Sequence, residues 1–107
     1  MADGTNFRSE RHTRVPVSQI ADTRRSFPDR NLVFDVEILG PGWQGIAAAA
    51  KVFAEAGLEL ASLHCSGADV IRCRLKDRQH ADLSRLAESI DRSSDLQLQR
   101  WTTIIAF

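Results

Sequence analysis

The 107-residue sequence has few cysteines, no excess of charge of either sign and no long apolar run. Its 14 basic and 14 acidic side chains cancel, which removes the simplest electrostatic argument for binding nucleic acid or an anionic membrane surface. No apolar segment approaches the length of a membrane span, and the polar N-terminus lacks the apolar core of a signal peptide. We therefore expect a cytoplasmic protein with neither membrane nor nucleic acid among its partners.

Cysteine is limited to Cys65 and Cys73. A chain of this length forms one domain and buries a modest core without disulfides or a metal. If the two cysteines flank a hairpin, Cys65 faces Val70 and Cys73 faces Ser62, so the thiols do not lie opposite each other. We expect both to be reduced and to pack as small buried hydrophobic side chains. His64 beside Cys65 adds a third soft ligand without the spacing of a zinc site, so we expect no metal and no cofactor.

The first 30 residues contain few apolar side chains and six arginines against four acidic residues. This composition predicts a flexible or partner-docked arm at residues 1–29, preceding a folded domain at residues 30–107. The only short extended candidate within the arm is Arg14–Ile20. Two interpretations stay open: a basic contact arm for an acidic partner, or a solvated extension that straps onto a partner chain.

Three glycines and a proline lie between residues 40 and 45, immediately before a run of strong helix formers. These residue types predict a tight turn that leads into a helix at residues 45–56. Gly57 lies where a left-handed helix cap is expected. One face of the helix is a narrow stripe of small apolar residues. The stripe contains Ile46, Ala49, Ala50, Phe53 and Ala56.

Four segments have strand character because apolar and polar residues alternate in them or because they are rich in β-formers. They are residues 31–39, 58–65, 70–75 and 96–107. A second helix is predicted at residues 77–92, with Asp77 as its N-cap.

The order strand, helix, strand, strand, helix, strand predicts an α+β fold of the ferredoxin-like βαββαβ type. In this arrangement a four-stranded antiparallel sheet carries both helices on one face. Its first and third strands are central neighbours, so Asp35 and Glu37 should lie across from Arg72 and Arg74 on the face without helices. Each such cross-strand pair contributes only about 0.2–1 kcal/mol, but like charges there would oppose the pairing.

The expected open face argues against two functional classes. RNA-recognition domains stack bases on aromatic side chains of the central strands, whereas this face presents carboxylates that repel phosphates. The side chains able to do acid–base or nucleophilic chemistry show no spacing of a known catalytic motif. They are His64, Cys65, Ser62, Asp35 and Glu37. We therefore expect a protein that is not an enzyme and does not bind RNA.

The glycine turn is the best candidate binding site in the sequence. Unpaired backbone amides at a helix N-terminus favour an anionic group such as a carboxylate. Trp43 and Gln44 could add an apolar wall and an amide hydrogen bond. In the alternative interpretation, the glycines only shape the loop, and Trp43 caps the core or packs on a neighbouring chain.

Residues 31–107 resemble an ACT domain. Pro41 and Gly42 match the turn after the first strand of that family, and Gly57 and Leu58 match the exit from the following helix. The resemblance implies a regulatory module with the fold described above. ACT domains commonly pair side by side or back to back and bind amino acids or other small effectors at the dimer interface near the turn.

Two hypotheses for function follow. The first is a stand-alone ACT-like regulatory domain, a homodimer that binds a small carboxylate-bearing effector such as an amino acid. Its ligand-binding residues would be Gly42, Trp43, Gln44 and Gly45 of one chain and Ser62 and His64 of its partner. The second is a protein–protein assembly or adaptor module without a small-molecule ligand, because exposed edge strands tend to be paired or covered. Its interface would be Trp101, Thr103 and Ile105 of the last strand together with the basic arm.

Overall fold

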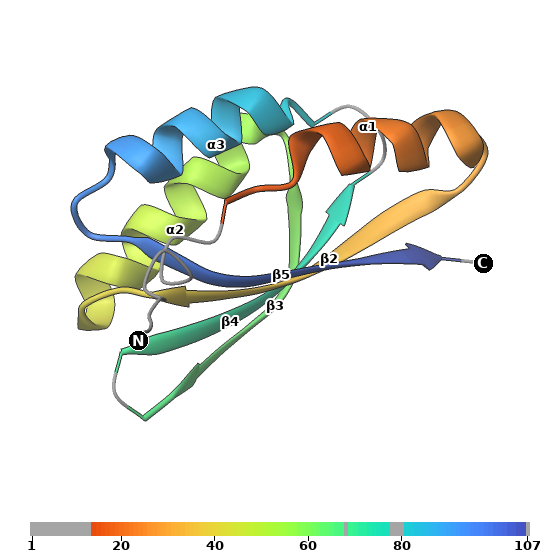
Figure 1. The fold of residues 1–107 in the computed structure, drawn as a ribbon. Helices are drawn as coiled ribbons and strands as arrows, with labels where there is room; N and C mark the ends of the chain where they lie inside the picture. Colours follow the sequence, from red (N-terminus) through yellow and green to blue (C-terminus); the bar gives the residue numbers. More distant parts are fainter. Residues whose placement is uncertain (1–13, 68, 78–80, 107) are drawn as a thin grey trace, which may run out of the picture.

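A computed structural model describes residues 14–67, 69–77 and 81–106. Three helices lie on one side of a four-stranded antiparallel sheet with the order β3-β4-β2-β5 (Figure 1). The helices are α1 (Val17–Ser26), α2 (Gly42–Ala56) and α3 (Leu83–Arg92), and the strands are β2 (Asn31–Leu39), β3 (Glu59–Ser66), β4 (Val70–Asp77) and β5 (Gln97–Ala106). The predicted α+β class and the four-stranded antiparallel sheet are confirmed.

The predicted pairing of the central strands is also confirmed. In the register of β2 and β4, Asp35 lies opposite Arg74 and Glu37 lies opposite Arg72. Arg74 donates hydrogen bonds from Nε and Nη2 to the two oxygens of Asp35 at 2.8 and 2.9 Å. The Arg72 Nε lies 3.0 Å from Oε2 of Glu37. The hydrogen bonds from Arg74 hold the pKa of Asp35 below its usual value, so this carboxyl is ionised at neutral pH.

The core lies between the sheet and the helices. On β2 and β4 every second side chain points toward the helices and is buried. These side chains are Leu32, Phe34, Val36, Ile38, Ile71, Cys73 and Leu75. The predicted stripe of α2 meets them through Ala49, Phe53 and Ala56, and its small residues let the helix lie close to the sheet. The helix begins at Gly42, three residues earlier than predicted, and ends at the predicted left-handed cap Gly57 (φ 89°).

The prediction of an extended segment at Arg14–Ile20 is wrong, because α1 begins at Val17. Ile20 is buried in the common core, and Val15 just before the helix is buried as well. A ten-residue helix with one buried side chain has almost no apolar periodicity, so tertiary contacts rather than local sequence stabilise it. Residues 1–13 of the expected arm lie outside the described residues.

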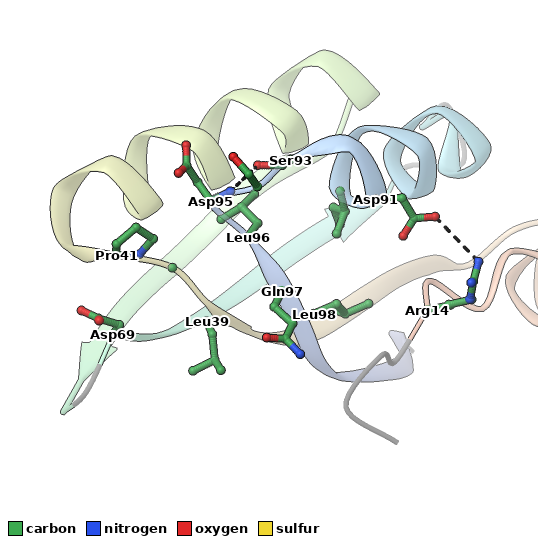
Figure 2. A pocket seen from close by; sticks show the side chains of 13 residues that line it. Arg14, Leu39, Pro41, Asp69, Asp91, Ser93, Asp95, Leu96, Gln97 and Leu98 are labelled. Carbon is green, nitrogen blue, oxygen red and sulfur yellow. Dashed lines mark hydrogen bonds and ion pairs between the residues drawn. The ribbon is translucent and has the colours of Figure 1, made fainter. Parts of the chain in front are cut away.

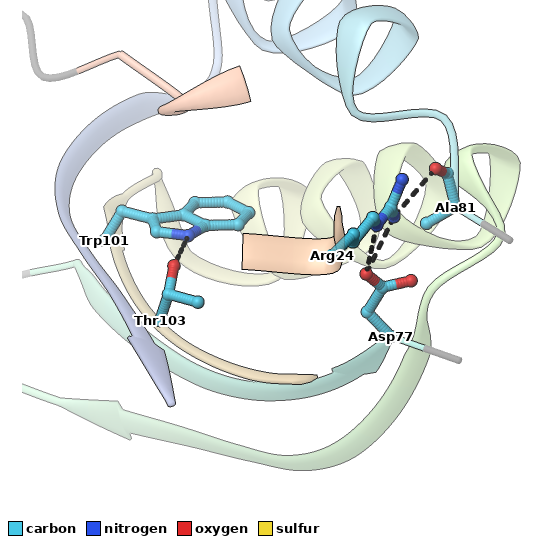
Figure 3. Close-up of polar contacts among 5 residues, drawn as sticks. All are labelled: Arg24, Asp77, Ala81, Trp101 and Thr103. Carbon is cyan, nitrogen blue, oxygen red and sulfur yellow. Dashed lines mark hydrogen bonds and ion pairs between the residues drawn. The ribbon is translucent and has the colours of Figure 1, made fainter. Parts of the chain in front are cut away.

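Asp77 is not the N-cap of the second predicted helix. It is the last residue of β4 and is fully buried, where its Oδ2 accepts hydrogen bonds from Nε and Nη2 of Arg24 at 3.0 and 2.7 Å (Figure 3). Nη2 of Arg24 also donates to the carbonyl oxygen of Ala81 at 3.1 Å, so α1 is tied both to the end of β4 and to the start of α3. The true N-cap of α3 is Asp82, whose side chain accepts from the backbone N–H of Arg85.

The hairpin between β3 and β4 pairs one residue away from the predicted register. Cys65 lies opposite Ile71 and Cys73 opposite Leu63, rather than opposite Val70 and Ser62. The loop between the last paired residues of the two strands is one residue shorter than expected. Both cysteines are free, but only Cys73 is buried, so the expectation of two buried thiols is wrong for Cys65.

Candidate functional site

The β2–α2 turn is glycine-rich because its backbone segments approach each other closely. A Cβ on Gly45 would lie 2.4 Å from the carbonyl carbon of Gly40, closer than any side chain can be accommodated. Gly42 adopts a φ of +53°, which a residue with a side chain rarely takes. Two of the glycines, Gly42 and Gly45, are thus required by the path of the chain.

Two of the amides expected to bind an effector, those of Gly42 and Gly45, already have partners within the chain. The N–H of Gly42 donates to Oδ1 of Asp69 at 3.3 Å, and the N–H of Gly45 donates to the carbonyl oxygen of Pro41 at 3.0 Å. The N–H of Gly40 donates to the carbonyl oxygen of Asp69 at 2.9 Å, which fixes this residue beside the turn. A carboxylate of the protein therefore stands at the start of α2, where the sequence led us to expect the carboxylate of an effector.

A cavity of about 580 Å³ adjoins this turn (Figure 2). It lies between the β2–α2 turn, the loop from α3 to β5 and the first residues of β5. Apolar side chains of Leu39, Ile90, Leu96 and Leu98 line part of it, and three carboxylates, those of Asp69, Asp91 and Asp95, line the rest. One cation opposes them, Arg14, whose Nη1 lies 3.8 Å from Oδ2 of Asp91. The cavity suits a small molecule with an apolar body and a positive group better than a simple carboxylate.

The structure divides the predicted ligand-binding residues into two groups. Trp43 and Gln44 lie at the start of α2, where both are exposed, and Trp43 is 84% accessible. It does not cap the core, so of the two alternatives for this side chain only packing on another molecule remains a prediction. Ser62 and His64 are on β3, at the far edge of the sheet, opposite Arg74 and Arg72. Within one chain the two groups do not form one site.

The predicted interface residues of β5 take part in the packing of their own chain. Trp101, Thr103 and Ile105 lie on the side of the sheet that faces the helices and are half-buried. The centroids of the Trp101 and Phe34 rings lie 4.8 Å apart. The indole N–H of Trp101 donates to Oγ1 of Thr103 at 3.2 Å (Figure 3). The exposed side chains of this strand belong to the opposite face, where Ile104 is 38% accessible.

The other edge strand, β3, has a surface that the sequence analysis did not identify. Its register places Leu60, Leu63 and Cys65 on the same side of the sheet as the buried side chains of β4. Leu60 is nevertheless 41% accessible, Leu63 is half-buried and Cys65 is exposed. The helices thus cover the central strands and leave the helix side of β3 partly bare. The signal in the sequence was the series of apolar residues in segment 58–65, which was predicted only as a strand.

Among the described residues, no three His, Cys, Asp or Glu side chains come together in a way that could hold a metal ion. No helix in the described part of the chain has the length and hydropathy needed to cross a membrane. The chain matches no protein-family model and no curated protein sequence. Its function must therefore be argued from its own geometry.

Proposed function

We propose that this chain is a protein–protein assembly module with a ferredoxin-like, ACT-like core, and that it forms a homodimer through β3. After α1, the order of elements is βαββαβ, with the first and third of these strands at the centre of the sheet. This order and pairing support the ferredoxin-like assignment. The resemblance of the turn and helix exit to ACT domains, which commonly work as dimers, supports the assembly role.

The observation that carries the proposal is the bare helix side of β3. An edge strand presents a row of unpaired backbone groups, and proteins usually cover such an edge or pair it with another strand. Here the edge is combined with exposed apolar side chains, Leu60 among them, that no helix of the described chain covers. Pairing with β3 of a second copy would satisfy the backbone and bury these side chains together.

The bulge in β3 indicates which part of the strand pairs. The register with β4 shifts between Leu60 and Ser62, whereas residues 62–66 continue without interruption. A bulge disturbs a ladder locally, so we expect the new ladder to run along residues 62–66. Leu60 would then pack at the end of this ladder, against the partner.

Light scattering after size-exclusion chromatography tests the proposal. We expect a mass of twice 11.9 kDa for the wild-type chain. Leu60→Lys should shift the mass toward the monomer, because a lysine on an edge strand opposes pairing with another strand. Ile104→Lys is the matched control, since Ile104 has nearly the same accessibility but lies on the other edge strand.

Three results would change the conclusion. A monomeric wild-type chain overturns the homodimer. A dimer that persists in Leu60→Lys but dissociates in Ile104→Lys moves the interface to β5, as the sequence-based hypothesis held. A dimer unaffected by either variant excludes both edge strands.

Effector binding at the glycine turn is a second candidate function, because the cavity of about 580 Å³ lies directly beside Gly40 and Pro41. Its three aspartates alter the expected ligand. An amino acid would direct its ammonium group, rather than its carboxylate, toward this end of the molecule.

A further inference from the structure

The face of the sheet that carries no helix has an ordered arrangement of charge. Cross-strand registers align its polar side chains in two rows perpendicular to the strands. The first row is Ser62, Arg74, Asp35 and Thr102, and the second is His64, Arg72, Glu37 and Arg100. Apart from His64, these side chains line a shallow depression of about 380 Å³.

Positive charge exceeds negative charge in this depression. Both carboxylates are already paired with arginines of β4, at 2.8 Å for Asp35 and 3.0 Å for Glu37. Arg100 lies opposite Glu37 on the other side, from β5, and forms no ion pair with any residue in the described part of the chain. The depression therefore contains three guanidinium groups and two carboxylates. The positive charge that no carboxylate neutralises is that of Arg100.

We propose that this open face binds a small oxyanion, a carboxylate or phosphate group, with Arg100 as its main ligand. A guanidinium group offers a fork of N–H donors that fits two oxygens of such an anion. The Thr102 hydroxyl lies two residues further along the same face of β5, a spacing of about 6.6 Å along the strand, and can donate to the same group. The N–H groups of Arg72 that do not contact Glu37 add further donors at the opposite rim.

The neighbouring carboxylates restrict this site to a small anion. Asp35 and Glu37 are both ion-paired, so their repulsion of an anion at Arg100 is reduced but not removed. A polyanion such as RNA would bring further phosphate groups close to these two carboxylates, which would repel them. The described residues of the open face also provide no aromatic side chain for base stacking, so the expectation of no RNA binding is unchanged.

Titration of 15N-labelled protein with sodium phosphate, sodium acetate and sodium chloride at equal ionic strength tests the site. We expect saturable shifts of the Thr102 amide and the Arg100 Nε–Hε resonance with phosphate or acetate but not with chloride. Tighter binding of phosphate identifies a phosphate-bearing ligand, and tighter binding of acetate identifies a carboxylate-bearing one.

Three variants make the test specific. Arg100→Gln should weaken binding about tenfold or more, as expected for loss of a charge-assisted hydrogen bond. Arg85→Gln, which removes an exposed arginine of α3 on the other side of the sheet, should leave binding unchanged. Glu37→Gln should tighten binding, because it removes the nearest negative charge and releases Arg72.

Saturable binding that is lost in Arg100→Gln and kept in Arg85→Gln distinguishes a site from general attraction to a basic patch. Shifts that stay linear with concentration for all three salts would overturn the proposal. Unchanged binding in Arg100→Gln, with the fold verified by circular dichroism, would overturn it as well.

Discussion

At the scale of single residues, the two thiols differ although they lie on the same side of neighbouring strands. Cys73 is buried between the sheet and the helices, whereas Cys65 is exposed on the edge strand. Burial raises the pKa of Cys73 to about 11, and the nearby Cys65 adds to the shift. Only a thiolate reacts readily with electrophiles, so the two cysteines should differ in reactivity.

We predict that iodoacetamide at pH 8 modifies Cys65 and leaves Cys73 largely intact. A pKa raised by two units lowers the thiolate fraction about a hundredfold, and burial hinders access further. Intact-protein mass spectrometry measures the reaction in the wild-type chain and in the two single variants. Cys65→Ser should abolish the fast reaction while Cys73→Ser preserves it. Equal rates at the two sites in the folded protein would contradict the assigned burial.

The same shift affects folding at alkaline pH. In the unfolded chain the pKa of Cys73 is near the ordinary thiol value of 9.0, whereas in the folded chain burial raises this pKa to about 11. Between these values the folded state binds more protons, so stability falls as pH rises through this window. Below pH 9 the contribution of Cys73 is constant. Cys73→Ala should reduce this fall in chemical denaturation measured at pH 8 and pH 10.5.

At the scale of elements, α1 depends on a few contacts with the rest of the fold. An isolated helix of ten residues is marginal in water, and only Ile20 of this helix is buried. The guanidinium of Arg24 provides the second attachment, through its hydrogen bonds to Asp77 and Ala81 (Figure 3). The docking of α1 therefore rests mainly on Ile20, with Val17 partly buried against the core, and on the ion pair between Arg24 and Asp77 of β4.

We predict that Arg24→Met lowers the free energy of unfolding by about 3 kcal/mol, because breaking a buried ion pair removes the compensation for desolvating Asp77. Arg25→Met is the matched control. Arg25 is exposed, and its one ion pair with a described residue is with Asp22 of the same helix, so its loss should change stability by at most about 0.5 kcal/mol. Urea denaturation followed by circular dichroism compares the two. Similar effects of both variants would show that the ion pair with Asp77 does not hold α1.

The elements that the sequence predicted well are those in which one residue pattern decides the structure. The alternation in residues 31–39 predicted β2 with its correct bounds, and the opposite charges on β2 and β4 predicted their register. The sequence did not reveal α1, because its stability comes from a partner in β4 rather than from periodicity. The side chains of Asp77 and Asp82 can both act as N-caps. Because β4 extends to Asp77, the N-cap of α3 is Asp82.

The candidate site was less predictable for a related reason. The sequence correctly placed a helix N-terminus after a glycine turn, which is a local feature. It could not show that Asp69, 27 residues away, supplies a carboxylate to the first amide of that helix. Nor could it show that Trp101 turns toward Phe34 while Trp43 points to solvent. Such choices depend on contacts between distant segments.

At the scale of the whole molecule, the possible binding regions lie at three separate places. The cavity is at the end of the sheet near the β2–α2 turn. The bare helix side of β3 is at one edge of the sheet, and Arg100 is on the open face of β5. Dimerisation through β3 would leave Arg100 accessible, because Arg100 lies on the opposite edge strand. An assembly role and ligand binding are therefore compatible in one chain, and variants at one place should not alter the others.

The cavity provides the last test, because its walls come from four segments that only the complete fold brings together. We predict that isoamylamine binds and that isovalerate, a similar branched chain with a carboxylate, does not. The three aspartates attract the ammonium group and repel the carboxylate, while Leu96 and Leu98 contact the apolar chain. Asp95 has no ion pair within the described part of the chain, so it is the carboxylate best able to accept a ligand.

Asp95→Asn should therefore weaken the binding of isoamylamine severalfold, as measured by isothermal titration calorimetry. Asp29→Asn is the control, because this exposed aspartate lies before β2, at the opposite end of that strand from the cavity. Leucine should bind more weakly than isoamylamine, since its carboxylate enters the same negative field. If isovalerate binds as tightly as isoamylamine, Asp69 does not exclude a second carboxylate, and the original expectation of a carboxylate-bearing effector regains its support.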